Sequence, residues 1–338
     1  MNPPYATGSP DVSVLLVTWN AGDDIAGCLE SVLRDKSAGS IEVIVVDNNS
    51  SDCTVDVVRS FPEVRLFQTG GNLGFALAMN IALKAAQGRY LFLLNPDARL
   101  VNDAVGHLVS FLDSHPDAGC ASPQLLNNDG SVALFVTRRF PSVTNTVLRQ
   151  FGLRRLFPQS TWMGREYLAG WDRESPRTVP CLSGAALMIP RSVYLEVGSL
   201  DTVLPMYFED LDYCKRIADK GNLLYYVPGA KVLHVGGKSA SASTAKRLLR
   251  GMEDGEAVWL FLRRYRGAAH AAAFRVVIAV GSLFRLMAIY PLRFLPQGLV
   301  PFARTAAQHA RHSSALLQWA LVPRPIFYTW INAHFTRS

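Results

Sequence analysis

Three short acidic segments and one histidine have residue types suited to chemistry at a phosphate-bearing substrate. In NPDA, Asp97 directly follows RYLFLL, an apolar run typical of a buried strand. A single carboxylate at a strand end is the hard oxygen ligand that Mg²⁺ or Mn²⁺ takes when a diphosphate supplies further ligands. Taken alone, NPDA can equally be a proline-containing turn.

The segment FEDLD and one later histidine offer further candidates. Glu209 and Asp210 open a predicted helix, and a carboxylate there without a cationic partner can deprotonate an attacking hydroxyl as a general base. Acids also favour helix starts in any protein, because the helix dipole stabilises them. His234, at the end of a predicted strand, is either a structural histidine or a metal ligand that complements Asp97.

A carboxylate and a glycine-rich segment earlier in the chain suit a nucleotide. Asp47 ends the apolar run IEVIVVD, where it can accept the imide N–H of uracil or thymine or, alternatively, cap a turn within DNNSSD. The glycines of GGNLGFALAMN precede a predicted helix whose N-terminus can contact phosphate oxygens. Their spacing is not GxGxxG after the first strand, which argues against a dinucleotide-binding dehydrogenase.

Alternating strands and helices must position these groups. Apolar runs of strand length are followed by helical patterns, and the predicted strands are 12–19, 41–47, 64–70 and 89–94. Strands that are apolar on both faces and alternate with helices indicate an α/β fold with a mostly parallel sheet covered on both sides. Ligands in such folds bind at the carboxyl ends of the strands, where Asp47 and Asp97 lie.

The last quarter of the chain has a different character. From residue 246 onward there are 13 Lys and Arg against 3 Asp and Glu, so the basic excess of the whole chain, +7, comes from this region. The apolar stretch 268–291 is interrupted by His270, Arg275 and Arg285. We predict a basic, helical extension that lies on an anionic membrane surface. A membrane-spanning helix and a helix packed on the core are the alternatives.

The composition argues against a secreted, disulfide-bonded protein and against a nucleic-acid-binding protein. Five cysteines without a CxxC pair are typical of reduced thiols, and the polar, proline-rich N-terminus lacks the pattern of a secretory signal. We therefore expect a cytoplasmic protein at the inner face of the cell membrane. The arginines of the tail are interleaved with aliphatic runs, which favours lipid headgroups over nucleic acid. The same apolar tail could instead form a homodimer interface.

Seven segments in one order carry a resemblance to a known family. These are VTWN, VVDNNSSD, NLGFALAMN, LLNPDA, SGAALMI, YFEDLDYCKR and HVGGKS. Together they resemble glycosyltransferase family 2, most closely its bacterial rhamnosyltransferase-type branch, over roughly residues 12–239. The resemblance implies the GT-A fold, a nucleotide-binding α/β sheet joined to an acceptor-binding half, and transfer with inversion at the anomeric carbon.

The family's donor-binding positions can be carried over onto matching segments. The resemblance implies that Thr18 and Asp47 contact the pyrimidine nucleoside. It implies that Asn49, Gly74 and Asn80 shape that pocket. The nucleotide is then a dTDP- or UDP-sugar, because uracil and thymine present the same imide group to Asp47.

The family's metal motif is altered in this chain. The motif usually written DxD corresponds to Asn95 and Asp97, so Asp97 is the position expected to hold Mg²⁺ or Mn²⁺, with His234 as a second metal or diphosphate contact. The first acid of the motif is replaced by Asn95. Arg99 follows two residues after Asp97, which leaves open weak metal affinity or partial replacement of the metal by a cation.

On the acceptor side, the resemblance implies that Ser183 and Gly184 form a loop at the acceptor, with Asp210 as general base and Glu209 beside it in contact with substrate. The expected function is transfer of a sugar, such as L-rhamnose from dTDP-rhamnose, to a lipid-linked or growing glycan. A non-catalytic membrane scaffold with the same fold is the alternative.

The expected domains follow the same division. They comprise a flexible N-terminus (1–10), a catalytic domain (11–243) whose two halves are 11–122 and 123–243, and the helical extension (244–338).

Overall fold

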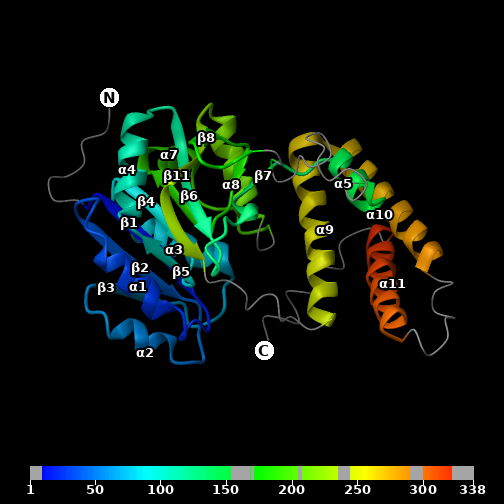
Figure 1. The fold of residues 1–338 in the computed structure, drawn as a ribbon, viewed down its shortest axis with the longest axis horizontal. Coiled ribbons are helices and arrows are strands. Elements are labelled where there is room, and N and C mark those ends of the chain that lie inside the picture. The colour runs from blue at the N-terminus through cyan, green and yellow to red at the C-terminus, as the bar shows by residue number, and fades with distance from the viewer. Residues whose placement is uncertain are drawn as a thin grey trace. The chain divides into compact units, whose positions relative to one another are not determined.

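The computed structural model describes residues 10–153, 168, 171–204, 208–234, 244–289 and 300–321. The chain divides into a first unit of residues 1–140 and 170–237 and a second unit of residues 141–169 and 238–338 (Figure 1). The division near residue 240 resembles the one expected from the sequence. It differs in that residues 141–169 belong to the second unit. The N-terminal segment 1–9 lies outside the described residues.

The first half of the sheet in the first unit is parallel. Strands β1 (Val12–Thr18), β2 (Ile41–Asp47), β3 (Val64–Gln68) and β4 (Tyr90–Leu94) lie in the order β3-β2-β1-β4. Thr18 pairs with Asp47 in register, so the carboxyl ends of β1 and β2 meet at one edge. The strands β1, β2 and β4 are almost wholly buried, as the apolar runs predict.

The second half of the sheet is mixed. Strand β10 (Ala186–Pro190) runs antiparallel to β4 and to β6 (Ala118–Leu126), and β11 (Leu223–His234) runs parallel to β6. The short β5 (Ala98–Val101) and β8 (Arg177–Thr178) pair antiparallel with β11. Because β10 is antiparallel, its beginning lies at the same edge as the end of β4. The loop before β10 therefore reaches the predicted site.

A separate two-stranded ribbon lies beside this edge. It pairs β7 (Thr137–Arg138) with β9 (Cys181–Leu182), and a 3₁₀ turn, η1 (Leu134–Val136), precedes it. The helices of the unit are α1 (Ile25–Arg34), α2 (Thr54–Arg59), α3 (Phe75–Ala85), α4 (Ala104–Ser114), α7 (Arg191–Val197) and α8 (Glu209–Asp219).

Helix ends in this unit follow the sequence signals. Gly198 and Gly221, after α7 and α8, have φ values of 86° and 85°, the left-handed conformation that glycine adopts without a steric cost. Helix α8 packs closely on the sheet where Gly119 faces Ile217. A Cβ atom at Gly119 would lie 2.3 Å from the Cγ2 atom of Ile217, so only glycine fits there. This packing fixes the helix that begins with Glu209 and Asp210.

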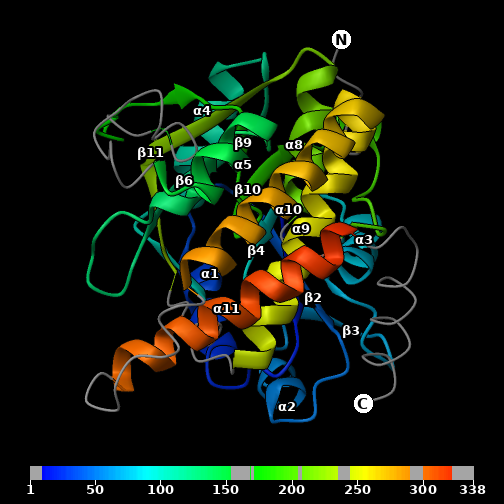
Figure 2. The ribbon, with the colours of Figure 1, turned by 90° about the vertical axis from the view of Figure 1, so that its right-hand side faces the viewer.

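The second unit is helical, as predicted for the tail. It contains α5 (Val143–Gln150), α9 (Thr244–Arg266), α10 (Ala268–Ile289) and α11 (Val300–Leu321), and α10 and α11 lie side by side (Figure 2). Its core includes the buried side chains Trp259, Phe274, Ile278, Leu316 and Trp319. Within the described residues, α10 is the helix long and apolar enough to cross a membrane.

The arginines that interrupt the apolar run of α10 make specific contacts inside the second unit. Arg275 donates to the carbonyl oxygens of Trp319 and Ala320 at the end of α11 (3.1 and 3.0 Å), and Arg285 donates to the carbonyl oxygen of Gln150 at the end of α5 (3.0 and 3.1 Å). A cation at a helix C-terminus satisfies carbonyls that have no partner within the helix. These contacts explain why two charges interrupt an otherwise apolar helix.

Candidate active site

Asp47 lies at the carboxyl end of β2 and is 1% exposed. Its Oδ1 atom accepts hydrogen bonds from the hydroxyls of Thr18 (3.0 Å) and Ser50 (2.5 Å), and its Oδ2 atom accepts from the backbone N–H of Ser50 (2.9 Å). This is the turn-capping arrangement that the sequence left open for DNNSSD. Three of the roughly four acceptor positions of the carboxylate are thus in use, which leaves one on Oδ2 for the predicted contact with a pyrimidine ring.

The glycine-rich loop is tied to the same edge by Asn48, which the sequence interpretation missed. The Oδ1 atom of Asn48 accepts from the backbone N–H of Leu73 (2.8 Å), and its Nδ2 atom donates to Asn72 (3.0 Å). Gly74, with φ 80°, precedes α3 and has no atom within 4 Å of an added Cβ. The N-terminus of α3 thus lies open beside β2, where an anion can approach. Asn49, with φ 65°, is exposed on the same loop as Asp47.

Asn80 has a different set of partners from the one expected for a nucleoside contact. Its side-chain amide donates to the carbonyl oxygen of Leu200 (2.9 Å) and accepts from the backbone N–H of Leu200 (2.8 Å). Asn80 is 8% exposed, so both polar groups of its side chain are used inside the protein. It joins α3 to the segment that leads toward α8, and its role in the nucleoside pocket stays a prediction.

Asn95, Asp97 and His234 converge at the end of β4. The Nε2 atom of His234 lies 3.5 Å from the Oδ1 atom of Asp97 and 3.3 Å from the Nδ2 atom of Asn95. The cause is the antiparallel pairing of β5 with β11, which sets His234 opposite Ala98. Neighbouring ligands of an octahedral Mg²⁺ ion lie about 3.0 Å apart. The 3.5 Å spacing of Asp97 and His234 therefore fits a divalent cation that takes its other ligands from a diphosphate and water.

Two further observations concern the number of protein ligands at this cation site and the position of Arg99. Within the described part of the chain, no group of three or more His, Cys, Asp or Glu side chains is placed to hold a metal, so Asp97 and His234 would form an open site. The guanidinium of Arg99 lies against α1, where a Cβ atom at Gly27 would be 2.7–2.9 Å from it. Arg99 is thus packed on a helix, which argues against its charge replacing the metal.

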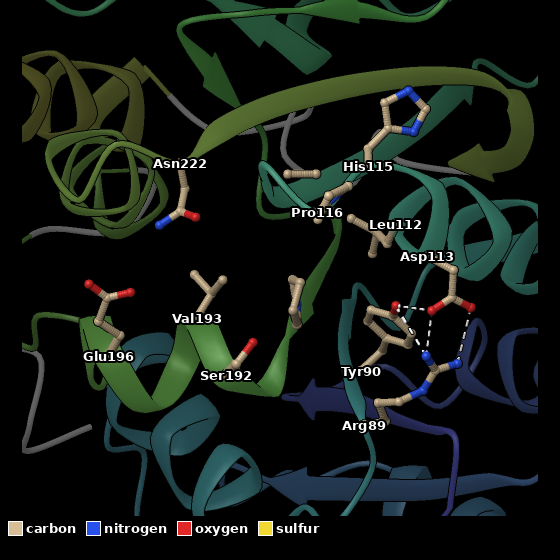
Figure 3. Close-up of a pocket in the computed structure, with 12 residues that line it drawn as sticks. Arg89, Tyr90, Leu112, Asp113, His115, Pro116, Ser192, Val193, Glu196 and Asn222 are labelled. Carbon is tan, nitrogen blue, oxygen red and sulfur yellow. Dashed lines mark hydrogen bonds and ion pairs between the residues drawn. The ribbon is translucent and has the colours of Figure 1, made fainter. Parts of the chain in front are cut away.

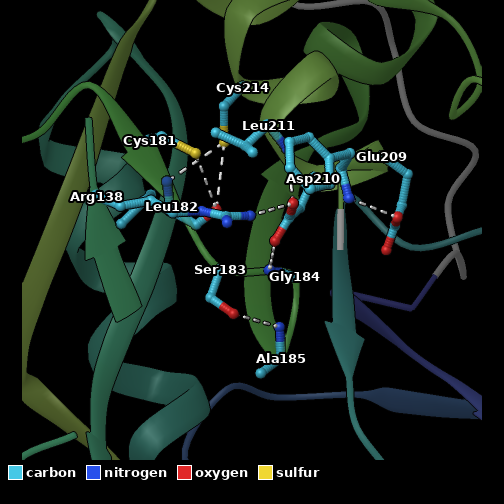
Figure 4. Close-up of polar contacts among 11 residues, drawn as sticks. Arg138, Cys181, Leu182, Ser183, Gly184, Ala185, Glu209, Asp210, Leu211 and Cys214 are labelled. Atoms are coloured by element: carbon cyan, nitrogen blue, oxygen red, sulfur yellow. Dashed lines mark hydrogen bonds and ion pairs between the residues drawn. The ribbon is translucent and has the colours of Figure 1, made fainter. Parts of the chain in front are cut away.

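Asp210, at the start of α8, is held by three donors (Figure 4). Its Oδ1 atom accepts from the Nη2 atom of Arg138 (3.0 Å) and from the backbone N–H of Leu211 (2.7 Å), and its Oδ2 atom accepts from the backbone N–H of Gly184 (3.2 Å). The interpretation of this residue as a base without a cationic partner is therefore wrong. The partner is Arg138, which β7 positions by pairing with β9.

The loop Ser183–Gly184–Ala185 joins the acid to the cation site. Gly184 donates to Asp210, and the carbonyl oxygen of the next residue, Ala185, accepts from the backbone N–H of Asn95 (2.9 Å). Asp210 and Asn95 are therefore both bonded to adjacent residues of this loop. Asp47 lies two strands from β4, about 10 Å along the edge. The edge thus brings the predicted nucleoside contact Asp47, the predicted cation ligands Asp97 and His234, and the carboxylate of Asp210 into one row.

Glu209 is buried beside Asp210, and its carboxylate accepts from the backbone N–H of Phe208 (3.1 Å). Burial and the neighbouring charge of Asp210 raise the pKa of Glu209 from 4.5 to about 8. Glu209 therefore carries a proton at neutral pH and can donate a hydrogen bond to a ligand oxygen.

Buried thiols lie behind the acidic pair. Cys181 and Cys214 contact the backbone of Leu182, and burial raises the pKa of both thiols. Both thiols are therefore protonated, and both cysteines are free.

A cavity of about 280 Å³ lies elsewhere, at the opposite edge of the sheet (Figure 3). It is lined by the beginnings of β4 and β6 and by α7, and Asp113 in its wall accepts hydrogen bonds from Arg89 and from the hydroxyl of Tyr90 (2.8 Å). These polar groups satisfy one another. The cavity contains none of the residues predicted to act on a substrate, so it is not the candidate active site.

Comparison with known proteins identifies the family. The model of glycosyl transferase family 2 matches residues 13–195. The chain belongs to this family. It is 31% identical over 248 residues to the N-acetylglucosaminyl-diphospho-decaprenol L-rhamnosyltransferase of Mycobacterium tuberculosis, covering 70% of this chain and 79% of that protein. It is 23% identical over 231 residues to the rhamnosyltransferase WbbL of Escherichia coli K12, covering 66% and 83%.

A solved structure supports the fold assignment. The mannosyltransferase PcManGT of Pyrobaculum calidifontis, solved with GDP-mannose and Mn²⁺, aligns with a TM-score of 0.56 and 18% identity over 95% of this chain and 92% of that chain. The fold is therefore GT-A, as the sequence resemblance implied, and the protein is a glycosyltransferase.

Proposed function

We propose that this family 2 glycosyltransferase moves L-rhamnose from dTDP-rhamnose to a hydroxyl of a lipid-linked or growing glycan. The observation that carries the proposal is the position of Asp210. Its carboxylate is bonded to Gly184, and the adjacent Ala185 is bonded to Asn95 of the cation site. An acceptor hydroxyl at Asp210 would then lie beside a donor whose diphosphate is at Asp97 and His234.

The transfer is a single displacement. The acceptor oxygen forms a bond to the anomeric carbon of the donor while the bond from that carbon to the diphosphate oxygen breaks. The hydroxyl proton passes to Asp210, and the nucleoside diphosphate leaves with the electron pair. Attack from the face opposite the leaving group inverts the configuration.

The remaining residues bind and orient the substrates. Asp97 and His234 would hold a Mg²⁺ or Mn²⁺ ion, which supplies stabilisation of charge on the departing diphosphate. Asp47 and the open N-terminus of α3 hold the nucleotide end, and the fully buried Thr18 orients Asp47 through its hydroxyl. Protonated Glu209 donates to a sugar oxygen.

Two nucleotide bases satisfy the proposed contact with Asp47. Asp47 would treat thymine and uracil alike, so a UDP-sugar is the alternative donor. The rhamnosyltransferase relatives support rhamnose as the transferred sugar. The intact carboxylates Asp97 and Asp210 and the intact His234 argue against a non-catalytic scaffold.

The experiment is donor binding and slow donor hydrolysis with a panel of dTDP- and UDP-sugars, with and without Mg²⁺ or Mn²⁺. Metal-dependent release of one nucleoside diphosphate names the donor. If no sugar nucleotide binds, the transferase proposal fails and the scaffold is the better account.

We also propose that α10 holds the enzyme at the cytoplasmic face of the membrane. Five apolar side chains form one stripe along α10 and are 51–69% exposed, namely Val276, Val280, Leu283, Phe284 and Met287. The end of α9 adds the exposed Arg263, Arg264 and Arg266. Apolar side chains beside exposed cations suit an anionic lipid surface.

Vesicle co-sedimentation tests this surface. The wild type should bind phosphatidylglycerol vesicles in a salt-sensitive manner, bind phosphatidylcholine vesicles weakly and show no matching affinity for an oligonucleotide. The Phe284→Glu variant should no longer bind the phosphatidylglycerol vesicles. If Phe284→Glu instead changes the sedimentation coefficient from a dimer to a monomer and leaves vesicle binding intact, the stripe is a homodimer interface.

A further inference from the structure

The ion pair between Arg138 and Asp210 places a cation at the predicted general base. The side chain of Arg138 is 25% exposed and that of Asp210 is 10% exposed, so Arg138 is the more accessible partner. Burial disfavours the guanidinium charge most strongly, but Asp210 together with the neighbouring Cys181 and Cys214 more than offsets it, and the pKa of Arg138 lies above its ordinary value. The arginine therefore stays charged throughout the working pH range.

The position of Arg138 is built by several long-range contacts. Arg138 pairs with Cys181 across the β7–β9 ribbon, and its guanidinium lies over the ring of Phe208, 5.8 Å from the centroid. The residue before it, Thr137, is fully buried and anchors the strand. An arginine held in this way loses less conformational entropy on binding a ligand than a mobile surface arginine.

We infer that Arg138 binds the diphosphate of a lipid-linked acceptor and so selects that acceptor class. The inference rests on the proposed function, in which a sugar hydroxyl lies at Asp210. A sugar diphosphate carries its charge one ring away from the hydroxyl that reacts. A guanidinium adjacent to Asp210 is placed to reach that charge, and its planar set of donors suits phosphate oxygens.

Charge balance explains why such a cation is needed. Glu209 is protonated at neutral pH, so Asp210 is the negative charge of the acidic pair and Arg138 offsets it. A diphosphate brought beside an uncompensated carboxylate would be repelled. The cation at Asp97 and His234 would be engaged by the donor and is not available to the acceptor.

The contact between Arg138 and the acceptor diphosphate also changes the hydrogen bonding of Asp210. In the structure Arg138 and Leu211 both donate to Oδ1 of Asp210. When the acceptor diphosphate shares the guanidinium, the bond from Arg138 to Oδ1 weakens and this oxygen can accept the hydroxyl proton. Arg138 thus couples arrival of the charged acceptor to the availability of the base.

The test compares two acceptors that differ in charge. One is N-acetylglucosaminyl diphosphate on a short polyprenyl chain, and the other is a neutral alkyl glycoside of N-acetylglucosamine with a matching chain length. A hydrogen bond to a charged group is worth about 10- to 100-fold in affinity. We expect the wild type to prefer the diphosphate acceptor by this factor in kcat/KM, and Arg138→Gln to lose most of the preference through a rise in KM for that acceptor.

Matched variants separate recognition from support of the fold. Arg139→Gln removes the same charge from the neighbouring, exposed residue and should keep the preference. Arg138→Lys keeps the charge and should keep part of it, which provides a second variant if Arg138→Gln folds poorly. If Arg138→Gln lowers kcat equally with both acceptors and the preference is unchanged, Arg138 only positions Asp210 and the inference is wrong.

The wild type distinguishes this inference from the proposed function. If the wild type turns over both acceptors without preferring the diphosphate, the inference fails and the transferase proposal stands. If it turns over neither and binds no sugar nucleotide, the proposed function is refuted and the inference falls with it.

Discussion

Glu209→Gln should change how the stability of the first unit depends on pH. The residue Glu209 is 6% exposed, and the pKa of its carboxyl rises from 4.5 to about 8 on folding. Between these values the folded chain keeps a proton that the unfolded chain has lost. The folded state then binds more protons, so the free energy of unfolding falls as pH rises and levels off above about pH 8.

The magnitude follows from the size of the shift. Each pKa unit corresponds to about 1.4 kcal/mol, so from pH 6 to pH 8 the wild type should lose about 2–3 kcal/mol that Glu209→Gln, which has no proton to lose, retains. The free energy of unfolding of the glutamine variant minus that of the wild type should therefore be about 2–3 kcal/mol larger at pH 9 than at pH 6. Urea unfolding of both proteins at pH 6, 7, 8 and 9, followed by a signal from the first unit, measures the difference.

A matched control isolates burial as the cause. Glu196 on α7 is a half-exposed glutamate near Lys220, so Glu196→Gln makes the same chemical change outside the buried acidic pair and serves as the control. If Glu209→Gln shifts stability by the same amount at pH 6 and at pH 9, Glu209 is ionised in the folded enzyme. The account of Asp210 as the charged member of the pair would then be wrong.

Three further substitutions test separate parts of the molecule. Asp210→Asn should bind the donor normally but lose about 10²- to 10⁴-fold in kcat, because a positioned base contributes that much, and loss of donor binding would contradict the assignment. Asp97→Ala should raise the Mn²⁺ concentration needed for half-maximal donor binding, and an unchanged titration would exclude Asp97 as a ligand. In the second unit, Gly281→Ala would place a Cβ atom 2.8 Å from the Cβ atom of Gln150 and should lower the free energy of unfolding by about 1–3 kcal/mol. The control is Gly255→Ala, whose Cβ atom meets its neighbour at an ordinary 3.7 Å and should be neutral or stabilising.

The sequence could predict the parts of the site that depend on local pattern. Buried runs that alternate with helices set Asp47 and Asp97 at strand ends, and the parallel register of β1 and β2 brings those ends to one edge. To predict that His234 lies beside Asp97, one would also have to know that β5 pairs antiparallel with β11. No local pattern encodes that pairing, although a histidine at a strand end made it plausible.

The parts that the sequence could not predict depend on contacts between distant residues. Arg138 belongs to a two-residue strand whose partner, Cys181, lies in another two-residue strand, and such short strands give no periodic signal. The only available signal was the paired arginines of TRRF ahead of a proline. Asn80 likewise bonds to the backbone of Leu200, and a side chain–backbone contact across 120 residues has no sequence signature.

Arg138 has a final consequence for water as a competing acceptor. Without a glycan, the Oδ1 atom of Asp210 accepts from both Arg138 and Leu211, and Oδ2 accepts from Gly184, so the carboxylate is poorly placed to activate a water molecule. Donor hydrolysis by the wild type should therefore be slow until a charged acceptor engages Arg138. In Arg138→Gln the charged donor to Oδ1 is absent, and the ratio of donor hydrolysis to transfer should rise several-fold. The ratio is measured as nucleoside diphosphate released per glycan product formed at saturating donor, and Arg139→Gln should match the wild type. A fall in this ratio in Arg138→Gln would mean that the ion pair holds Asp210 ready for proton transfer instead of restraining it.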